Sequence, residues 1–139
     1  MTNGRCVSRR TAIAAAAAML AGAARAHDEA ARWYVAAEAM KRLALSWGDQ
    51  PYGAVLVRDG RVIGEGPSRV VRNADPDAHA EREAIRDART RLGVQRLEGA
   101  VLYSTSRPCS LCEAAAAQAG VSRMVYGAAL TDGGPPLLR

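Results

Sequence analysis

The dipeptide Asp59-Gly60 lies between two runs of residues that favour β-strands, and it constrains the fold more than any other feature of the chain. The two runs are residues 52–58 and 61–65. Asp-Gly readily adopts the positive φ angles that a type I′ turn needs at both central positions. The pattern therefore predicts a β-hairpin, and with it a sheet that is antiparallel where it begins.

Helical and strand patterns alternate around this hairpin. Apolar residues at spacings of three and four predict an amphipathic helix over residues 28–47, which ends at Gly48-Asp49-Gln50-Pro51. After the hairpin the patterns predict a helix over 78–92 with Asp77 as its N-cap, a strand over 100–104, a helix over 109–119, a strand over 121–127 and a Gly/Pro-rich tail over 131–139. The order α-β-β-α-β-α-β predicts one α/β domain with three α/β/α layers, in which a mixed sheet starts with the hairpin and continues through parallel crossovers.

The first 26 residues resemble an export signal of the twin-arginine type. Ser8-Arg9-Arg10 precedes an alanine-rich run over 12–24, and Ala24-Arg25-Ala26 is a cleavage pattern directly before the first acidic residues. We therefore expect residues 1–26 to be a signal peptide, residues 27–139 to be the functional domain and the protein to be periplasmic or secreted. An alanine-rich helix is the alternative, as is a cytoplasmic protein whose start codon is misassigned. The run is too short to span a membrane, which takes about 20 apolar residues.

The positive charge of the chain belongs largely to this leader. The full chain has 19 basic and 14 acidic residues, and residues 1–26 contain four arginines and no acid. Residues 27–139 therefore have 15 basic and 14 acidic side chains, a net charge of +1. Binding of a polyanion depends on clustered basic residues. Arg82, Arg86 and Arg89 recur at helical spacing, but the acidic residues among them indicate a solvated face of mixed charge, so a nucleic-acid partner is not expected.

Two of the three cysteines form a Cys-x-x-Cys pair. Cys6 lies in the leader, which leaves Cys109 and Cys112. By itself the pair is compatible with a loop disulfide, a redox motif or half of a zinc site.

Metal-ligating residues occur at two predicted helix starts. Asp77-Ala78-His79-Ala80-Glu81 opens one, and Arg107-Pro108-Cys109-Ser110-Leu111-Cys112 opens the other. Cysteines at i and i+3 share a helix face, and the first helical turn favours the thiolate. His79, Cys109 and Cys112 would supply three ligands and leave the fourth tetrahedral position open, which is typical of catalytic zinc. Glu81 would act as a proton carrier beside the metal.

His79-x-Glu81 followed by Pro108-Cys109-x-x-Cys112 matches the signature of the zinc-dependent nucleobase deaminases. The chain resembles the cytidine/deoxycytidylate deaminase superfamily over roughly residues 30–130, most closely its guanine deaminases and tRNA adenosine deaminases. Further matching stretches are Pro51-x-Gly53-Ala54-Val55 and Leu102-Tyr103. The resemblance implies a cytidine-deaminase-like fold and a hydrolase that releases ammonia by attack of zinc-bound hydroxide.

The resemblance also implies roles for individual residues. Glu81 would be the catalytic residue that moves protons, and the backbone N–H of Ala80 would stabilise the tetrahedral intermediate. Ser68 stands where relatives of the guanine and tRNA types have a substrate-binding Asn. Asp132 lies in a stretch similar to one in which guanine deaminases have a substrate-side aspartate.

The sequence departs from the family at three places. Ser68 is one, and Arg107 is another, because relatives have a Glu before the Pro-Cys turn. The third is the C-terminus at Arg139, where relatives continue with a strand and a helix that close the pocket.

The expected substrate is a free nucleobase or nucleoside, with a guanine-like purine favoured. Cytosine or cytidine comes second and tRNA third, because tRNA is not expected outside the cytoplasm. A homodimer is expected, since family members commonly complete their sites across a dimer interface. A non-catalytic zinc-binding module and a redox protein built on the two cysteines are the alternatives from other classes.

Overall fold

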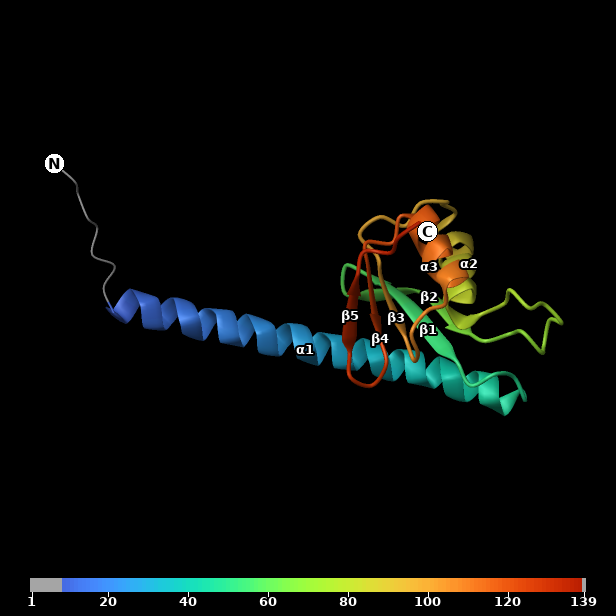
Figure 1. Ribbon diagram of the computed structural model, residues 1–139, viewed down its shortest axis with the longest axis horizontal. Helices are drawn as coiled ribbons and strands as arrows, with labels where there is room; N and C mark the ends of the chain where they lie inside the picture. The colour runs from blue at the N-terminus through green and yellow to red at the C-terminus, as the bar shows by residue number, and fades with distance from the viewer. Residues whose placement is uncertain (1–8, 139) are drawn as a thin grey trace.

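The computed structural model describes residues 9–138 as a three-layer body with one long helix that extends beyond it (Figure 1). The elements are α1 (Arg9–Ser46), β1 (Gly53–Arg58), β2 (Arg61–Pro67), α2 (Ala80–Leu92), β3 (Val101–Ser104), α3 (Ser110–Ala119), β4 (Arg123–Tyr126) and β5 (Thr131–Gly134). This arrangement confirms the predicted α/β class. None of the described helices is both long enough and apolar enough to cross a membrane.

The five strands form one mixed sheet in the order β2-β1-β3-β4-β5. β1 and β2 pair as the predicted antiparallel hairpin, with Asp59 at φ 52° and Gly60 at φ 70° in its turn. β1 is also antiparallel to β3, whereas β3 and β4 are parallel and joined through α3. β2 and β3 consequently run in the same direction on either side of β1, as a helical crossover through α2 requires.

Helices cover both faces of the sheet because its central strands are apolar on both sides. Ala54 and Leu56 of β1 face the core formed with α2 and α3. Val55 and Val57 face the opposite side, where Trp33 of α1 packs against them. This alternation follows from the two-residue period of a strand, and it separates α1 from the other two helices.

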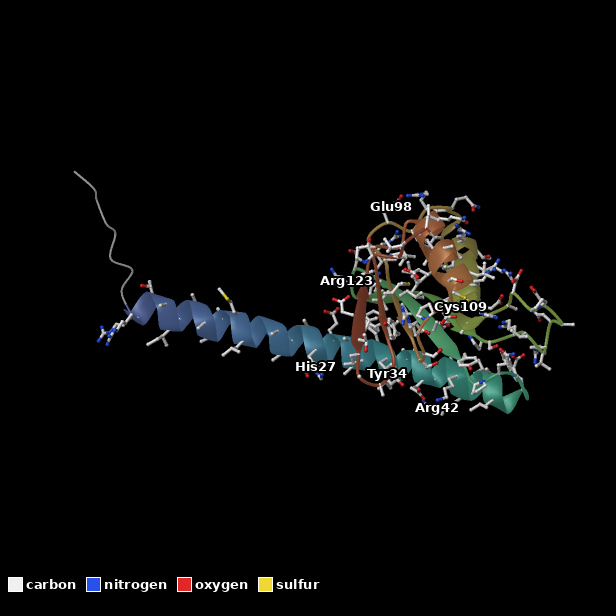
Figure 2. All side chains as sticks on the ribbon, in the orientation of Figure 1. His27, Tyr34, Arg42, Glu98, Cys109 and Arg123 are labelled. Atoms are coloured by element: carbon white, nitrogen blue, oxygen red, sulfur yellow. The ribbon has the colours of Figure 1, made fainter. Side chains whose placement is uncertain are left out.

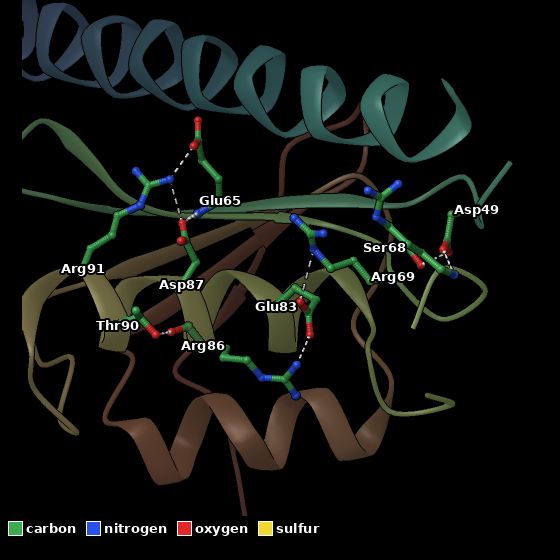
Figure 3. Close-up of polar contacts among 10 residues, drawn as sticks. Asp49, Glu65, Ser68, Arg69, Glu83, Arg86, Asp87, Thr90 and Arg91 are labelled. Atoms are coloured by element: carbon green, nitrogen blue, oxygen red, sulfur yellow. Dashed lines mark hydrogen bonds and ion pairs between the residues drawn. The ribbon is translucent and has the colours of Figure 1, made fainter. Parts of the chain in front are cut away.

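Polar contacts fix the edge strand β2 on α2 (Figure 3). The Glu65 backbone N–H donates to Asp87 Oδ2 over 2.8 Å, and Arg91 pairs with both Glu65 and Asp87. Elsewhere on α2, Arg86 pairs with Glu83 over 2.6 Å and Arg82 pairs with Asp77 over 3.4 Å. The prediction of a mixed-charge face on this helix is therefore confirmed.

Three predicted boundaries differ from the structure. α1 spans Arg9–Ser46, because the alanine-rich run continues the helix predicted for 28–47 without a break. The predicted N-cap Asp77 is wrong: Asp75 and Ala78 close a turn, and α2 begins after His79. The tail over 131–139 contains β5, which pairs with β4 after a turn at residues 127–130.

Candidate metal centre and pocket

His79, Cys109 and Cys112 converge where the N-termini of α2 and α3 meet, and their ligand atoms all lie within 4.8 Å of one another. His79 Nδ1 is 3.7 Å from Cys109 Sγ and 3.4 Å from Cys112 Sγ. A tetrahedral zinc ion with ordinary Zn–N and Zn–S bonds places nitrogen and sulfur ligands about 3.5 Å apart. The three residues therefore fit zinc, and both thiols are free rather than joined in a disulfide.

The two helix starts orient these ligands. His79 is the N-cap of α2 with extended backbone, and its side chain makes no capping hydrogen bond, so the imidazole is available to a metal. Cys109 is the N-cap of α3, and its Sγ accepts from the Cys112 backbone N–H over 3.4 Å. This bond fixes the Cys109 side chain on the first turn of α3.

Cys112 is the buried ligand of the three. Burial raises the pKa of its thiol, and the nearby carboxylate of Glu81 raises it further. Loss of that proton therefore depends on a cation at the site, which is the usual coupling between metal binding and thiol ionisation.

Glu81 lies in the first turn of α2 and is only 5% exposed, and a residue of the sheet holds its side chain in place. Its Oε1 accepts a 2.7 Å hydrogen bond from the hydroxyl of Ser104, the last residue of β3. Residues two apart do not share a face along a helix. At this helix end, however, both His79 and Glu81 line the same pocket.

The pocket has a volume of about 540 Å³ and is open to solvent. It is lined by Gln50, Tyr52, His79, Ala80, Glu81, Ser106, Arg107 and Cys109. Ala80 is the first residue of α2, where backbone N–H groups have no partner within the helix. Arg107 contributes the one cationic side chain to this lining.

Two predicted substrate contacts lie elsewhere in this structure. Ser68 is fully buried outside the pocket lining, and its hydroxyl donates to Asp49 over 2.9 Å. Asp132 is exposed on β5 and pairs with Arg123 at the start of β4. Because β3 and β4 are parallel, Arg123 lies at the opposite end of the sheet from Cys109, which follows β3 (Figure 2). The substrate roles of Ser68 and Asp132 stay predictions.

Sequence reasoning missed Asp49, Gln50, Tyr52 and Ser104. Gln50 and Tyr52 line the pocket from the turn between α1 and β1, where no motif marks them. Ser104 closes a predicted strand five residues before Cys109, and a polar residue at that position is the one available signal.

Residues 27–128 match the family model for the cytidine and deoxycytidylate deaminase zinc-binding region. The chain is 49% identical over 84 residues to a tRNA-specific adenosine deaminase of Agrobacterium fabrum, covering 60% of this chain and 55% of the relative. It is 43% identical over 82 residues to a guanine deaminase of Bacillus subtilis, covering 59% and 53%. The chain therefore spans about half the length of the curated relatives it matches.

Solved structures agree with these sequence relatives. A tRNA:A34 deaminase superposes with a TM-score of 0.66 at 43% identity, covering 69% of this chain and 70% of that one. The crystal structure of the Bacillus subtilis guanine deaminase superposes with a TM-score of 0.67 at 36% identity, covering 70% and 62%. The predicted cytidine-deaminase-like fold is thereby confirmed.

Proposed function

The chain belongs to the cytidine and deoxycytidylate deaminase zinc-binding family, and from that premise we propose that it is a zinc-dependent hydrolytic deaminase of a free nucleobase or nucleoside, with a guanine-like purine favoured. The observation that carries the proposal is the meeting of three metal ligands with a buried carboxylate in one pocket. A zinc-binding module without catalytic activity does not require a carboxylate at this position.

In the proposed reaction the metal would activate the water, and side chains of the protein would move the protons. His79, Cys109 and Cys112 would hold zinc, which when bound supplies a Lewis acid that makes a water acidic near neutral pH. Glu81 would accept a proton from the water that attacks the amino-bearing ring carbon, and then return protons to the ring nitrogen and the departing amine. The products are ammonia and a ring carbonyl.

Ser104 and Ala80 would support these steps. The hydroxyl of Ser104 holds Glu81 Oε1, so the carboxylate is oriented before the substrate arrives. The backbone N–H of Ala80, at the start of α2, would donate to charge that develops on the reacting centre. Arg107 lines this pocket, and it adds a positive charge to the lining.

A small substrate is favoured by size and charge. The pocket volume of about 540 Å³ lies in the range of small-molecule sites. Arg82, Arg86 and Arg91 of α2 are paired with acidic side chains rather than gathered in an unpaired basic stripe. A guanine deaminase is among the relatives.

A tRNA adenosine deaminase is the second candidate function. The 49% identity to an enzyme of that name and the superposition on a tRNA:A34 deaminase both favour it. Cytosine or cytidine is a further small-molecule alternative within the family.

Release of ammonia from a substrate panel tests the proposal. The purified zinc-loaded protein is assayed with guanine, cytosine, cytidine, adenosine and a tRNA anticodon stem-loop, and zinc content is measured on the same sample. Turnover of guanine supports the favoured assignment, and turnover of the stem-loop alone supports the second candidate. Bound zinc without turnover of any substrate would indicate a binding module.

Replacement of Glu81 separates metal binding from catalysis. Glu81→Ala removes the proton carrier but none of the three ligands, so we expect one zinc per chain and a rate at least about 100-fold lower, the usual contribution of general acid–base catalysis. Glu113→Ala, on the partly buried first turn of α3, is the matched control. Undiminished ammonia release from Glu81→Ala would refute the role assigned to Glu81.

A homodimer is part of the proposal, because the family resemblance implies a site that is completed across a dimer interface. Sedimentation velocity of the purified chain at micromolar concentration tests it. A single species at the monomer mass would contradict this part and leave the enzymatic proposal untouched.

A further inference from the structure

Asp49 has an environment that is unusual for a carboxylate outside a reactive site. It lies in the turn after α1 and is 7% exposed, and its two oxygens accept three hydrogen bonds. Figure 3 shows Asp49 beside Ser68. The Ser68 hydroxyl and the Gln50 backbone N–H donate to Oδ1 over 2.9 and 2.8 Å. The Arg72 backbone N–H donates to Oδ2 over 2.8 Å.

These bonds join two segments that lie about 20 residues apart in the chain. One is the turn between α1 and β1. The other is the segment 68–78, which has no regular secondary structure over most of its length and leads directly into His79. The segment is closed at its base, where the Arg69 N–H donates to the Ala78 carbonyl over 3.0 Å.

The arginines of the same segment reinforce this junction. Arg72 and Arg69 place their guanidinium groups 4.4 and 4.8 Å from the centre of the Trp47 ring, two residues before Asp49. Arg69 also pairs with Glu83 of α2 over 3.4 Å, and Glu83 is itself 7% exposed. The contacts thus run from the end of α1 through residues 68–72 to the first turn of α2.

The turn between α1 and β1 forms one wall of the pocket, and the residues that directly follow the segment 68–78 form another. Gln50 and Tyr52 follow Asp49, while His79, Ala80 and Glu81 follow the segment 68–78. The Ser68 N–H donates to the Tyr52 carbonyl over 3.1 Å, so the segment 68–78 is joined directly to the wall that contains Gln50 and Tyr52.

We propose that Asp49 is a positioning residue of the proposed deaminase site, whose carboxylate fixes the segment 68–78, and with it the His79 end of α2, against the Gln50–Tyr52 wall. Ser68 acts in this arrangement as a donor to Asp49. The inference rests on the proposed function for its catalytic consequence, but its structural part stands without it.

The electrostatics agree with this role. Burial acts to raise the pKa of Asp49, but hydrogen bonds from the backbone at Arg72 and Gln50 and from Ser68 outweigh it, so the pKa lies below its ordinary value. The carboxylate is therefore charged at neutral pH, when its bonds to the segment are strongest.

Asp49→Asn tests the proposal, with Asp59→Asn as the matched control. The variant keeps the size of the side chain but removes its charge and places an NH₂ group among donors. Asp59 lies in the exposed hairpin turn at φ 52°, a conformation that Asn tolerates. Three measurements are made on each protein: amide hydrogen exchange, zinc affinity by chelator competition, and kcat and KM on the substrate found in the panel.

We expect the amides of residues 68–78 in Asp49→Asn to exchange about tenfold faster or more, which is the effect of weakening a charge-assisted hydrogen bond. The amides of Leu102 and Tyr103 in the central strand β3 should keep their wild-type rates. Zinc affinity should fall, and KM should rise more than kcat falls, because Glu81 and Ser104 remain held by the packing of α2 on the sheet. Asp59→Asn should match the wild type throughout.

Faster exchange in β3 to the same extent would mean that Asp49 serves only global stability, and it would overturn the proposal. So would unchanged exchange over 68–78. Hydrogen exchange and zinc affinity can be measured on a protein without activity. An inactive wild-type protein would therefore refute the proposed function, and the exchange rates would still test the structural role of Asp49.

Ser68→Ala is a milder second variant that separates the two roles of Ser68. As a donor to Asp49, its loss should accelerate exchange over 68–78 by a smaller factor than Asp49→Asn does. A raised KM with unchanged exchange would instead show that the hydroxyl contacts substrate, and it would overturn the role of Ser68 in this arrangement.

Discussion

Glu81 and Ser104 belong to different elements and meet in the interior, so neither is replaceable without consequence for the other. Their side chains are 5% and 1% exposed, and the bond between them is 2.7 Å long. A buried carboxylate that loses a donor suffers the desolvation penalty of an unsatisfied group, about 1–3 kcal/mol. This penalty falls on the residue proposed to move protons.

Ser104→Ala should therefore lower kcat about tenfold or more while one zinc per chain is retained, because the ligands are untouched. The measurements are ammonia release under saturating substrate and zinc content on the same sample. Ser106→Ala removes a hydroxyl from the pocket lining two residues away and serves as the control. Equal losses of activity in the two variants would contradict a specific role for the bond to Glu81.

The metal ligands could be predicted from sequence because each helix start carries its ligands in a short motif. Ser104 and Asp49 could not, because their contacts join residues 23 and 19 positions apart that only the fold brings together. The same limit applies to Ser68. The family resemblance suggested a substrate contact for it, whereas its hydroxyl in this structure donates to Asp49.

At the scale of elements, the close approach of helices to the sheet depends on glycine. A Cβ on Gly66 of β2 would overlap the Ala80 carbonyl oxygen and the Ala84 nitrogen, both backbone atoms of α2. Gly53 of β1 stands in the same relation to the backbone of α1 at Ala37 and Lys41. Relief would require a shift of a whole helix, since backbone atoms cannot rotate away.

Gly66→Ala should destabilise the fold by about 2 kcal/mol or more, in the range of overpacked cores, and weaken zinc binding because α2 carries His79 at its start. Urea unfolding and chelator competition measure the two effects. Gly22→Ala is the control, because a Cβ there meets nothing within 4 Å and alanine favours a helix. Wild-type stability in Gly66→Ala would contradict the close packing of β2 on α2.

Elements with strong local signals were predicted well, and those formed by tertiary contact were not. The hairpin, α3 and the central strands follow from turn chemistry, the C-cap Gly120 and apolar runs. β5 has the sequence Thr-Asp-Gly-Gly, which has little strand preference, and it forms because the edge of β4 offers unpaired backbone groups. α2 begins at Ala80 because Asp75 to Ala78 make a turn of their own.

At the scale of the whole molecule, α1 has two parts with different surroundings. Every residue from Arg9 to Glu29 is exposed, and this part projects from the body (Figure 1). From Trp33 onward the helix packs on the sheet, with Trp33 at 5% and Ala37 at 0% exposure. The family match starts at residue 27, near this change in surroundings.

We propose that residues 1–26 are a removable export signal and that residues 27–139 form the working domain. Residues 9–26 are all exposed, so removal of the leader should change the free energy of unfolding by no more than about 0.5 kcal/mol, the range of surface changes. The chain starting at His27 should also bind zinc and turn over substrate as the full chain does. Urea unfolding and the ammonia assay on both proteins check this, and a large loss of stability in the shorter chain would contradict it.

Export itself is tested by expression of the full chain in a bacterium with a twin-arginine pathway. We expect a periplasmic product that begins at His27 by mass spectrometry, with a net charge of +1 instead of +5. Arg9→Lys with Arg10→Lys keeps the charge and helix propensity but removes the paired arginines, so it should leave the protein unprocessed in the cytoplasm. An intact Met1 on wild-type protein from the periplasm would contradict cleavage, and wild-type protein confined to the cytoplasm would contradict export. In the second case tRNA would become an accessible substrate, and the location of the protein would favour the second candidate function over the first.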